Sequence, residues 1–148
     1  MGKSSKKSPK HQSLPSSTKK PRKDPSLPES LNVTPVWQAG IIDLNGPWGW
    51  MEISHRVFLD NILPKLQHFE SMSWHEILGR NNHEVEVEKI SKKAQKRLTD
   101  LKLDDYETLV SLRLTGPQRV WGIKMQNIFK ILWWDPNHEV YPSTLKNT

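Results

Sequence analysis

Apolar residues recur at helical spacing between residues 54 and 69, where six of them line one face of a predicted helix. Ser54 can cap the start of this helix, because its hydroxyl accepts a bond from a backbone N–H that has no helical partner. Pro64 lies inside the pattern and lacks an N–H, so we expect it to kink the helix or to shift its start. The apolar face consists of Val57, Phe58, Ile62, Leu63, Leu66 and Phe69.

Two serines predict further helix starts. Ser73 is followed three residues later by Glu76, which is a capping-box pattern, and Gly79 ends the short helix that this box opens. Ser91 caps a basic helix over residues 92–101, whose inner face carries Ala94, Leu98 and Leu101. Between these helices, residues 83–90 alternate valine with glutamate, which predicts a short exposed strand.

The last third of the chain changes from helical to strand-like patterning. Residues 109–114, 119–124 and 128–134 are rich in β-branched and aromatic residues, and only short turns separate them. Connections this short join antiparallel strands. After the turn at residues 135–137 we expect a short final strand at residues 138–141. The order of elements predicts an α+β fold, in which helices from residues 54–101 pack on one face of an antiparallel sheet over residues 108–142.

Residues 35–53 form a segment rich in tryptophan and glycine that precedes the helices. Three of the seven tryptophans of the chain lie in residues 37–50, with Gly40, Gly46, Pro47 and Gly49 between them. Turn-forming residues between large aromatics indicate a loop or short strand packed on the core, and we favour such a structural cover over a ligand-stacking surface.

Residues 1–34 consist mainly of lysine, serine and proline. They contain eight of the 22 basic residues and two of the 16 acidic residues, so residues 35–148 are formally neutral. A segment with so little apolar surface is expected to be disordered. It is either an arm that touches nucleic acid, an import signal or a solvating extension. Residues 35–148 are expected to form a single domain.

Composition and missing motifs exclude several classes of function. Without cysteine, the chain has no disulfides, no thiolate zinc site and no thiol nucleophile. We find no Gly-rich phosphate loop, no nucleophile elbow and no histidine spacing typical of a metal site. We therefore expect no metal and no cofactor. The apolar runs are too short to cross a membrane and no secretory signal is evident, so we expect a cytoplasmic protein.

The predicted sheet carries the remaining candidates for chemistry. Arginine suits bidentate phosphate contact, aromatic rings can stack on bases, and histidine can move protons near neutral pH. Arg119 falls on the same strand face as Trp121 and Ile123, where it is either paired with an acid or set at the edge of an aromatic surface. Arg113 and Arg119 could equally pair with helix carboxylates such as Glu107 or Glu70. The candidates are Arg113, Arg119, Lys124, Lys130, His138 and Tyr141.

Four short motifs in this region resemble the RelE/ParE superfamily of small toxins. They are Leu112-Arg113-Leu114, Arg119-Val120-Trp121-Gly122, Ile128-Phe129-Lys130-Ile131-Leu132 and His138-Glu139-Val140-Tyr141. The resemblance covers residues 54–144 in the order of elements and residues 108–142 in sequence pattern. It implies a RelE-like fold.

The resemblance to the RelE branch implies a toxin that cuts mRNA on the ribosome or otherwise blocks translation. Cleavage would need no metal, since the RNA 2′-hydroxyl is the nucleophile in such chemistry. Arg119 would contact the scissile phosphate, and Tyr141 and His138 would take part in cleavage. Arg113, Lys124 and Lys130 would bind RNA. Partners would be RNA or the ribosome, together with a cognate antitoxin protein. The alternative is a non-catalytic module on the same scaffold that recognises a protein or a nucleic acid.

Overall fold

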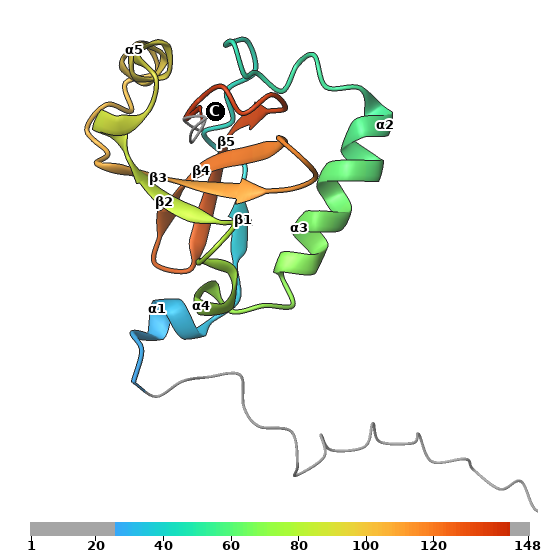
Figure 1. Cartoon of the computed structure of the whole chain (residues 1–148), viewed down its shortest axis with the longest axis vertical. Helices are drawn as coiled ribbons and strands as arrows, with labels where there is room; N and C mark the ends of the chain where they lie inside the picture. The colour runs from blue at the N-terminus through green and yellow to red at the C-terminus, as the bar shows by residue number, and fades with distance from the viewer. Residues whose placement is uncertain (1–25, 143–148) are drawn as a thin grey trace, which may run out of the picture.

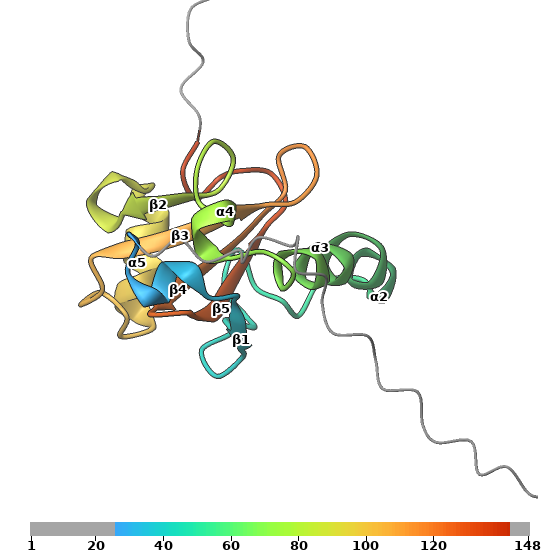
Figure 2. The same ribbon diagram turned by 90° about the horizontal axis from the view of Figure 1, so that it is seen from below.

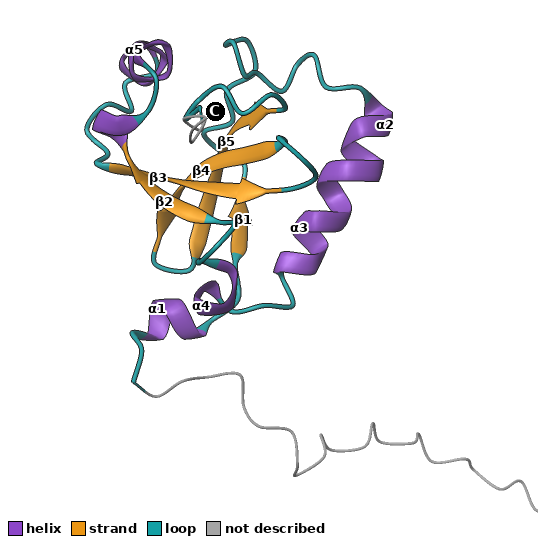
Figure 3. Cartoon of the chain, viewed as in Figure 1, coloured by secondary structure: helices purple, strands orange, loops and turns teal. Residues whose placement is uncertain are grey.

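One five-stranded sheet organises the protein, in a computed structural model that describes residues 26–142. The strand order is β1-β5-β4-β3-β2, and helices lie beside the sheet (Figures 1 and 3). The predicted α+β class is therefore confirmed. The strands are β1 (Val36–Gln38), β2 (His83–Glu86), β3 (Thr108–Arg113), β4 (Arg119–Met125) and β5 (Ile128–Asp135).

The sheet is mixed, which corrects the expectation of a purely antiparallel meander. The pairs β2–β3, β3–β4 and β4–β5 are antiparallel, and the short connections within β3–β5 predict the last two. β1 pairs parallel with β5. A long stretch of chain separates these two strands, so no tight turn dictates their relative direction.

Residues 138–141 do not form the final strand that the pattern predicts. The backbone N–H groups of Glu139 and Val140 bond to the side chain of Asp135, at 2.8 and 3.0 Å. These donors are therefore not available to a strand ladder, and the chain folds into a compact hook over residues 135–141.

Helices cover both faces of the sheet, whereas we expected them on one. The helix formed by α2, η1 and α3 lies on the opposite side of the sheet from α5 (Figure 2). β3 explains why, because its four central residues are all buried, and a strand buried on both sides needs cover on both sides. The helical segments are α1 (Glu29–Asn32), α2 (His55–Val57), η1 (Phe58–Ile62), α3 (Leu63–Phe69), α4 (Trp74–Ile77), η2 (Val87–Lys89) and α5 (Lys92–Asp100).

Pro64 is accommodated by a π-helical turn, while the helix still starts at the predicted cap Ser54. η1 is this π-helical turn, in which the N–H of Leu63 bonds to the carbonyl of Phe58. Because Pro64 has no N–H for the carbonyl four residues earlier, the wider turn accommodates its ring and α3 then continues. Ser54, Ser73 and Ser91 cap their helices, and Ser73 forms the complete capping box with Glu76.

Each face of the sheet has its own apolar core. One core joins the helix η1–α3 and α4 to the sheet, and its buried helical members are Ile62, Leu66, Phe69, Trp74 and Ile77. The other joins α5 to the opposite face through Ala94 and Leu98. Gly122 lies in β4, where an added Cβ would be 2.4 Å from the Phe129 ring and from the Lys130 carbonyl of β5. Only glycine therefore lets β5 pack this closely at that position.

A β-bulge places two consecutive residues of β5 in the α5 core. Trp121 pairs with Trp133 and Gly122 pairs with Ile131, so Leu132 is an extra residue in β5. Leu132 and Trp133 are both buried in this core. The carbonyl of Leu132 accepts bonds from the backbone N–H of Asp43 at 3.0 Å and from the Trp50 indole at 3.2 Å.

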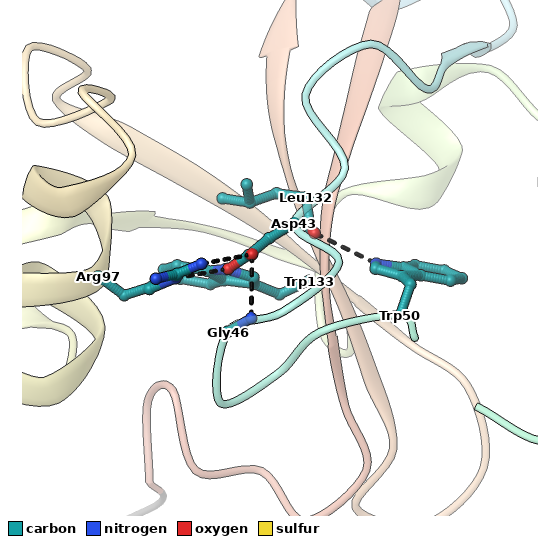
Figure 4. Close-up of polar contacts among 6 residues, drawn as sticks. All are labelled: Asp43, Gly46, Trp50, Arg97, Leu132 and Trp133. Carbon is teal, nitrogen blue, oxygen red and sulfur yellow. Dashed lines mark hydrogen bonds and ion pairs between the residues drawn. The ribbon is translucent and has the colours of Figure 1, made fainter. Parts of the chain in front are cut away.

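The segment at residues 35–53 wraps the β5 edge and is locked there by a buried carboxylate. Asp43 is 3% exposed and accepts two bonds of 2.8 Å from the Arg97 guanidinium on α5 (Figure 4). It also accepts bonds from the Trp133 indole and the Gly46 N–H. The pKa of Asp43 is lowered, mainly by the Arg97 hydrogen bonds against the opposing effect of burial.

The folded part begins earlier than the expected boundary between residues 34 and 35. α1 lies inside the segment predicted as tail, and Leu31 packs on the core of α3 and α4. The Trp74 N–H also bonds to the Val33 carbonyl. The rest of the predicted tail, residues 1–25, lies outside the described residues, as do residues 143–148. No helix within residues 26–142 is long and apolar enough to cross a membrane.

Candidate functional site

Two arginines face each other across β3 and β4. Arg113 is the direct register partner of Arg119, so both side chains lie on the α5 face of the sheet. Like charges placed directly opposite in a sheet destabilise it. Such a pair is therefore typical of a place where an anion binds between the two guanidinium groups.

Among the described residues neither arginine forms an ion pair with a carboxylate, although the charge of Asp135 acts on Arg119 and opposes the lowering of its pKa. Arg119 donates from Nη1 to the carbonyls of Gly116 at 2.7 Å and Gln118 at 3.0 Å. Arg113 donates from Nη1 to the Asn81 Oδ1 at 3.3 Å. Within residues 26–142, no ion pair involves either side chain, which answers the suggestion that they pair with Glu107 or Glu70.

The hook at residues 135–141 carries the two other candidates and is held by Asp135. This carboxylate is 0% exposed and accepts three bonds, from the Trp121 indole and from the N–H groups of Glu139 and Val140. Asp135 is next to Arg119 in the sheet register, but its oxygen atoms are used inside the hook. Its role is therefore to hold the hook against β4.

His138 projects from this hook with an unusual backbone conformation. Its φ of 58° lies in the left-handed region, which residues with side chains seldom occupy and which is concentrated at functional positions. Burial lowers the pKa of His138 below its ordinary value of 6.5, and the charges of Arg119 and Arg113 lower it further, while Asp135 opposes them. The imidazole is thus neutral near pH 7 and able to accept a proton.

Arg113, Arg119, His138 and Tyr141 line one pocket of about 230 Å³, which we call the arginine pocket. Burial and the neighbouring Arg113 lower the pKa of Arg119 and the charge of Asp135 opposes them, but an arginine stays charged at neutral pH. Tyr141 is 39% exposed at the pocket. The full lining is Arg80, Asn81, His83, Val85, Ser111, Arg113, Arg119, Trp121, His138 and Tyr141.

The other two predicted RNA-binding residues lie elsewhere. Lys124 is an odd number of residues from Arg119, so it is on the opposite face, where its Nζ lies 5.5 Å from the centre of the Trp74 ring. Burial lowers the pKa of Lys124. Lys130 pairs with Ile123 near the far end of β4, away from Arg119.

Sequence reasoning missed four polar residues of the arginine pocket, namely Arg80, Asn81, His83 and Ser111. His83 is the register partner of Ser111, which in turn faces Trp121, so the three side chains form a row across the sheet. The period-2 alternation of β2 places His83 on one face with Val85. This alternation is visible in the sequence, but only the pairing of β2 with β3 places His83 in the arginine pocket.

The chain has a second pocket of opposite charge. It measures about 520 Å³ and is lined by Glu86, Glu88, Asp104, Asp105 and Glu107 among others. Its carboxylates repel phosphates, so it does not suit a nucleic acid. Within the described part of the chain, no cluster of histidine and acidic residues has the arrangement of a metal site.

No family model matches this chain, and no curated protein or solved structure matches it. Its function therefore has to be inferred from the chemistry of the arginine pocket.

Replacing Asp135 by alanine is expected to destabilise the protein by roughly 2–4 kcal/mol, because two buried donors and one half-buried donor lose their acceptor. Urea unfolding measures the loss. The Trp121 indole N–H resonance should also shift, since its hydrogen bond is removed. Glu139→Ala is the control, because this exposed side chain bonds only to Asn137 among the described residues, and it should change stability by less than about 0.5 kcal/mol. Equal effects of the two variants would contradict the role of Asp135.

Proposed function

We propose that this protein is a RelE-like toxin that cuts single-stranded mRNA in the cytoplasm by a metal-independent reaction. The observation that carries the proposal is the pair Arg113 and Arg119, which face each other and form no ion pair among the described residues, beside the neutral His138. The resemblance of residues 108–142 to the RelE branch supports it, because Arg119, His138 and Tyr141 line the same pocket.

Arg113 and Arg119 suit the scissile phosphate. Their guanidinium groups carry more donors than their present hydrogen bonds use, and a phosphate between them would relieve their mutual repulsion. In the transition state the phosphate gains negative charge. Fixed positive charges in a half-buried pocket stabilise that charge more than they stabilise the substrate.

His138 suits the role of general base. Its neutral imidazole accepts the proton of the RNA 2′-hydroxyl, and the 2′-oxygen then bonds to the neighbouring phosphorus. The bond from phosphorus to the 5′-oxygen breaks, and that oxygen takes a proton from Tyr141 at the pocket. The products are a 2′,3′-cyclic phosphate on one fragment and a 5′-hydroxyl on the other.

The proposal is tested by incubating the full chain with single-stranded RNA in a buffer that contains a metal chelator. We expect cleavage that yields cyclic-phosphate and 5′-hydroxyl ends, detected by mass spectrometry of the fragments, because the nucleophile comes from the RNA. A DNA strand of the same sequence should stay intact, since it has no 2′-hydroxyl. RNA binding without any cleavage, on or off the ribosome, would favour the alternative of a non-catalytic binding module.

A further inference from the structure

Two further hollows lie beside α3, and one of them shares lining residues with the arginine pocket, although that pocket lies on the α5 face of the sheet. The second hollow measures about 420 Å³ and shares Asn81 and Arg113 with the arginine pocket. The third measures about 360 Å³ and shares Lys65, His68 and Thr115 with the second. Figure 1 shows the turn between β3 and β4 reaching toward the helix of α2 and α3. Residues of this turn and of α3 line the second hollow, namely Thr115, Gly116, Lys65 and His68. Together the second and third hollows form a groove that leads away from the site.

The groove and the pocket share one sign of charge where they meet. Arg113 lines both, and Lys65 adds a second cation to the second hollow, which no carboxylate lines. The third hollow includes one acid, Asp60, which forms an ion pair of 3.2 Å with Arg56. A polyanion that occupies the arginine pocket can therefore extend along α3 without meeting an uncompensated negative charge.

Side chains along the groove match the repeating groups of a nucleic-acid strand. Lys65 and His68 are three residues apart, so they lie on the same face of α3. Lysine contacts a phosphate as a point charge, and an exposed histidine ring offers a surface on which an unpaired base can stack. The wall toward the arginine pocket is fixed, because the buried Asn82 accepts the Arg113 N–H at 2.8 Å and donates to the Ile77 carbonyl.

We propose that the groove binds the nucleotides of a single-stranded RNA that flank the scissile phosphate, with Lys65 on a phosphate and His68 under a base. This assignment rests on the proposed function, since it takes the RNA in the arginine pocket as its starting point. A duplex does not fit the chemistry, because its bases are stacked on one another and are not available to His68.

Binding as a function of RNA length tests the groove. The probes are single-stranded oligonucleotides of about two, about four and about eight nucleotides, titrated by fluorescence anisotropy. The full chain carries His138→Gln, so that the probes stay intact. In this background we expect affinity to rise steeply from the shortest to the longest probe, because only the longer strands reach α3.

Adding Lys65→Ala and His68→Ala should remove most of that rise. We expect about tenfold weaker binding of the longest probe, and a salt dependence flatter by about 0.7 in log–log slope for the lost phosphate contact. The matched control is Lys96→Ala with His55→Ala, which removes the same residue types from exposed positions outside the pocket and the groove. This control should keep the length dependence.

The outcomes separate the groove from the cleavage chemistry. An unchanged length dependence in the Lys65 and His68 variant overturns the groove, even if the wild type cuts RNA. Tighter binding of a duplex of equal length also overturns it, as does the absence of RNA binding at low salt. If the wild type cuts nothing but the length dependence vanishes with Lys65 and His68, the groove stands and the cleavage proposal fails.

Discussion

Replacing His138 by glutamine is expected to slow RNA cleavage by about a hundred- to ten-thousand-fold, because a positioned general base typically contributes that much. Glutamine keeps a polar side chain of similar length but cannot accept the 2′-hydroxyl proton. The rate of cyclic-phosphate formation at saturating RNA measures the effect. Combining this change with Arg119→Ala should also abolish any growth arrest caused by expressing the protein at equal abundance.

The pH dependence of cleavage should follow the lowered pKa of His138. The reaction needs the neutral imidazole, and a lowered pKa keeps it neutral to more acidic pH than an ordinary histidine. The rate should therefore begin to fall only below about pH 6.5. Arg119→Gln should move this acid limb toward higher pH, because it removes a positive charge beside the imidazole, although burial remains the larger cause.

His75→Gln is the matched control for His138. His75 is an exposed histidine of α4 and does not line the arginine pocket, so we expect its replacement to leave the cleavage rate unchanged. Urea unfolding of both variants shows whether the fold is intact. If a folded His138→Gln protein keeps the wild-type rate within about threefold, another group is the base and the proposed role of His138 is wrong.

Replacing Arg97 by methionine is expected to destabilise the protein by about 3–5 kcal/mol. Asp43 has a side chain that is 2% exposed, so it would keep its charge in a buried place without a cation. Arg97 itself is 25% exposed, and methionine preserves most of its apolar packing on α5. Most of the expected loss therefore comes from the isolated carboxylate.

The same variant should change how stability depends on pH. In the wild type the pKa of Asp43 is lowered, so its stabilising effect is complete above the unfolded value near 3.8 and is lost as pH falls through the folded value. Without Arg97, burial is expected to raise the pKa of this carboxyl instead. The unfolding free energy of the variant should then fall as pH rises from about 4 to about 7, where the wild-type contribution is flat.

Lys96→Met is the control for Arg97→Met. It removes one positive charge from an exposed position of the same helix and should change the unfolding free energy by less than about 0.5 kcal/mol. Urea unfolding at several pH values provides the measurement for both variants. Equal stabilities of the two variants, or parallel pH profiles, would show that Asp43 and Arg97 do not lock residues 35–53 onto the sheet.

Local signals in the sequence were enough to predict the strands that short turns connect and the helix starts that serine residues cap. The antiparallel strands β3, β4 and β5 start and end within about one or two residues of the predicted ranges, because short turns dictate pairing between neighbours. The helix starts at Ser54, Ser73 and Ser91 follow from hydroxyl groups that bond to N–H groups three residues ahead.

Part of the candidate site could be predicted from the same local signals in the sequence. Arg113 and Arg119 lie on β3 and β4, His138 and Tyr141 lie in the hook that follows β5, and the structure places all four in one pocket. Lys124 and Lys130 were grouped with them on charge alone. The strand alternation puts Lys124 on the opposite face, and distance along the strands separates Lys130 from the pocket.

Contacts between distant parts of the chain were decided only by the tertiary structure. The Asp43–Arg97 pair joins residues 54 positions apart, β1 joins the sheet in parallel, and β2 brings His83 to the arginine pocket. The distribution of helices over two faces and the bulge at Leu132 belong to the same class. Local patterns specify which face of an element is apolar, but the partner that covers this face is selected by packing over the whole chain.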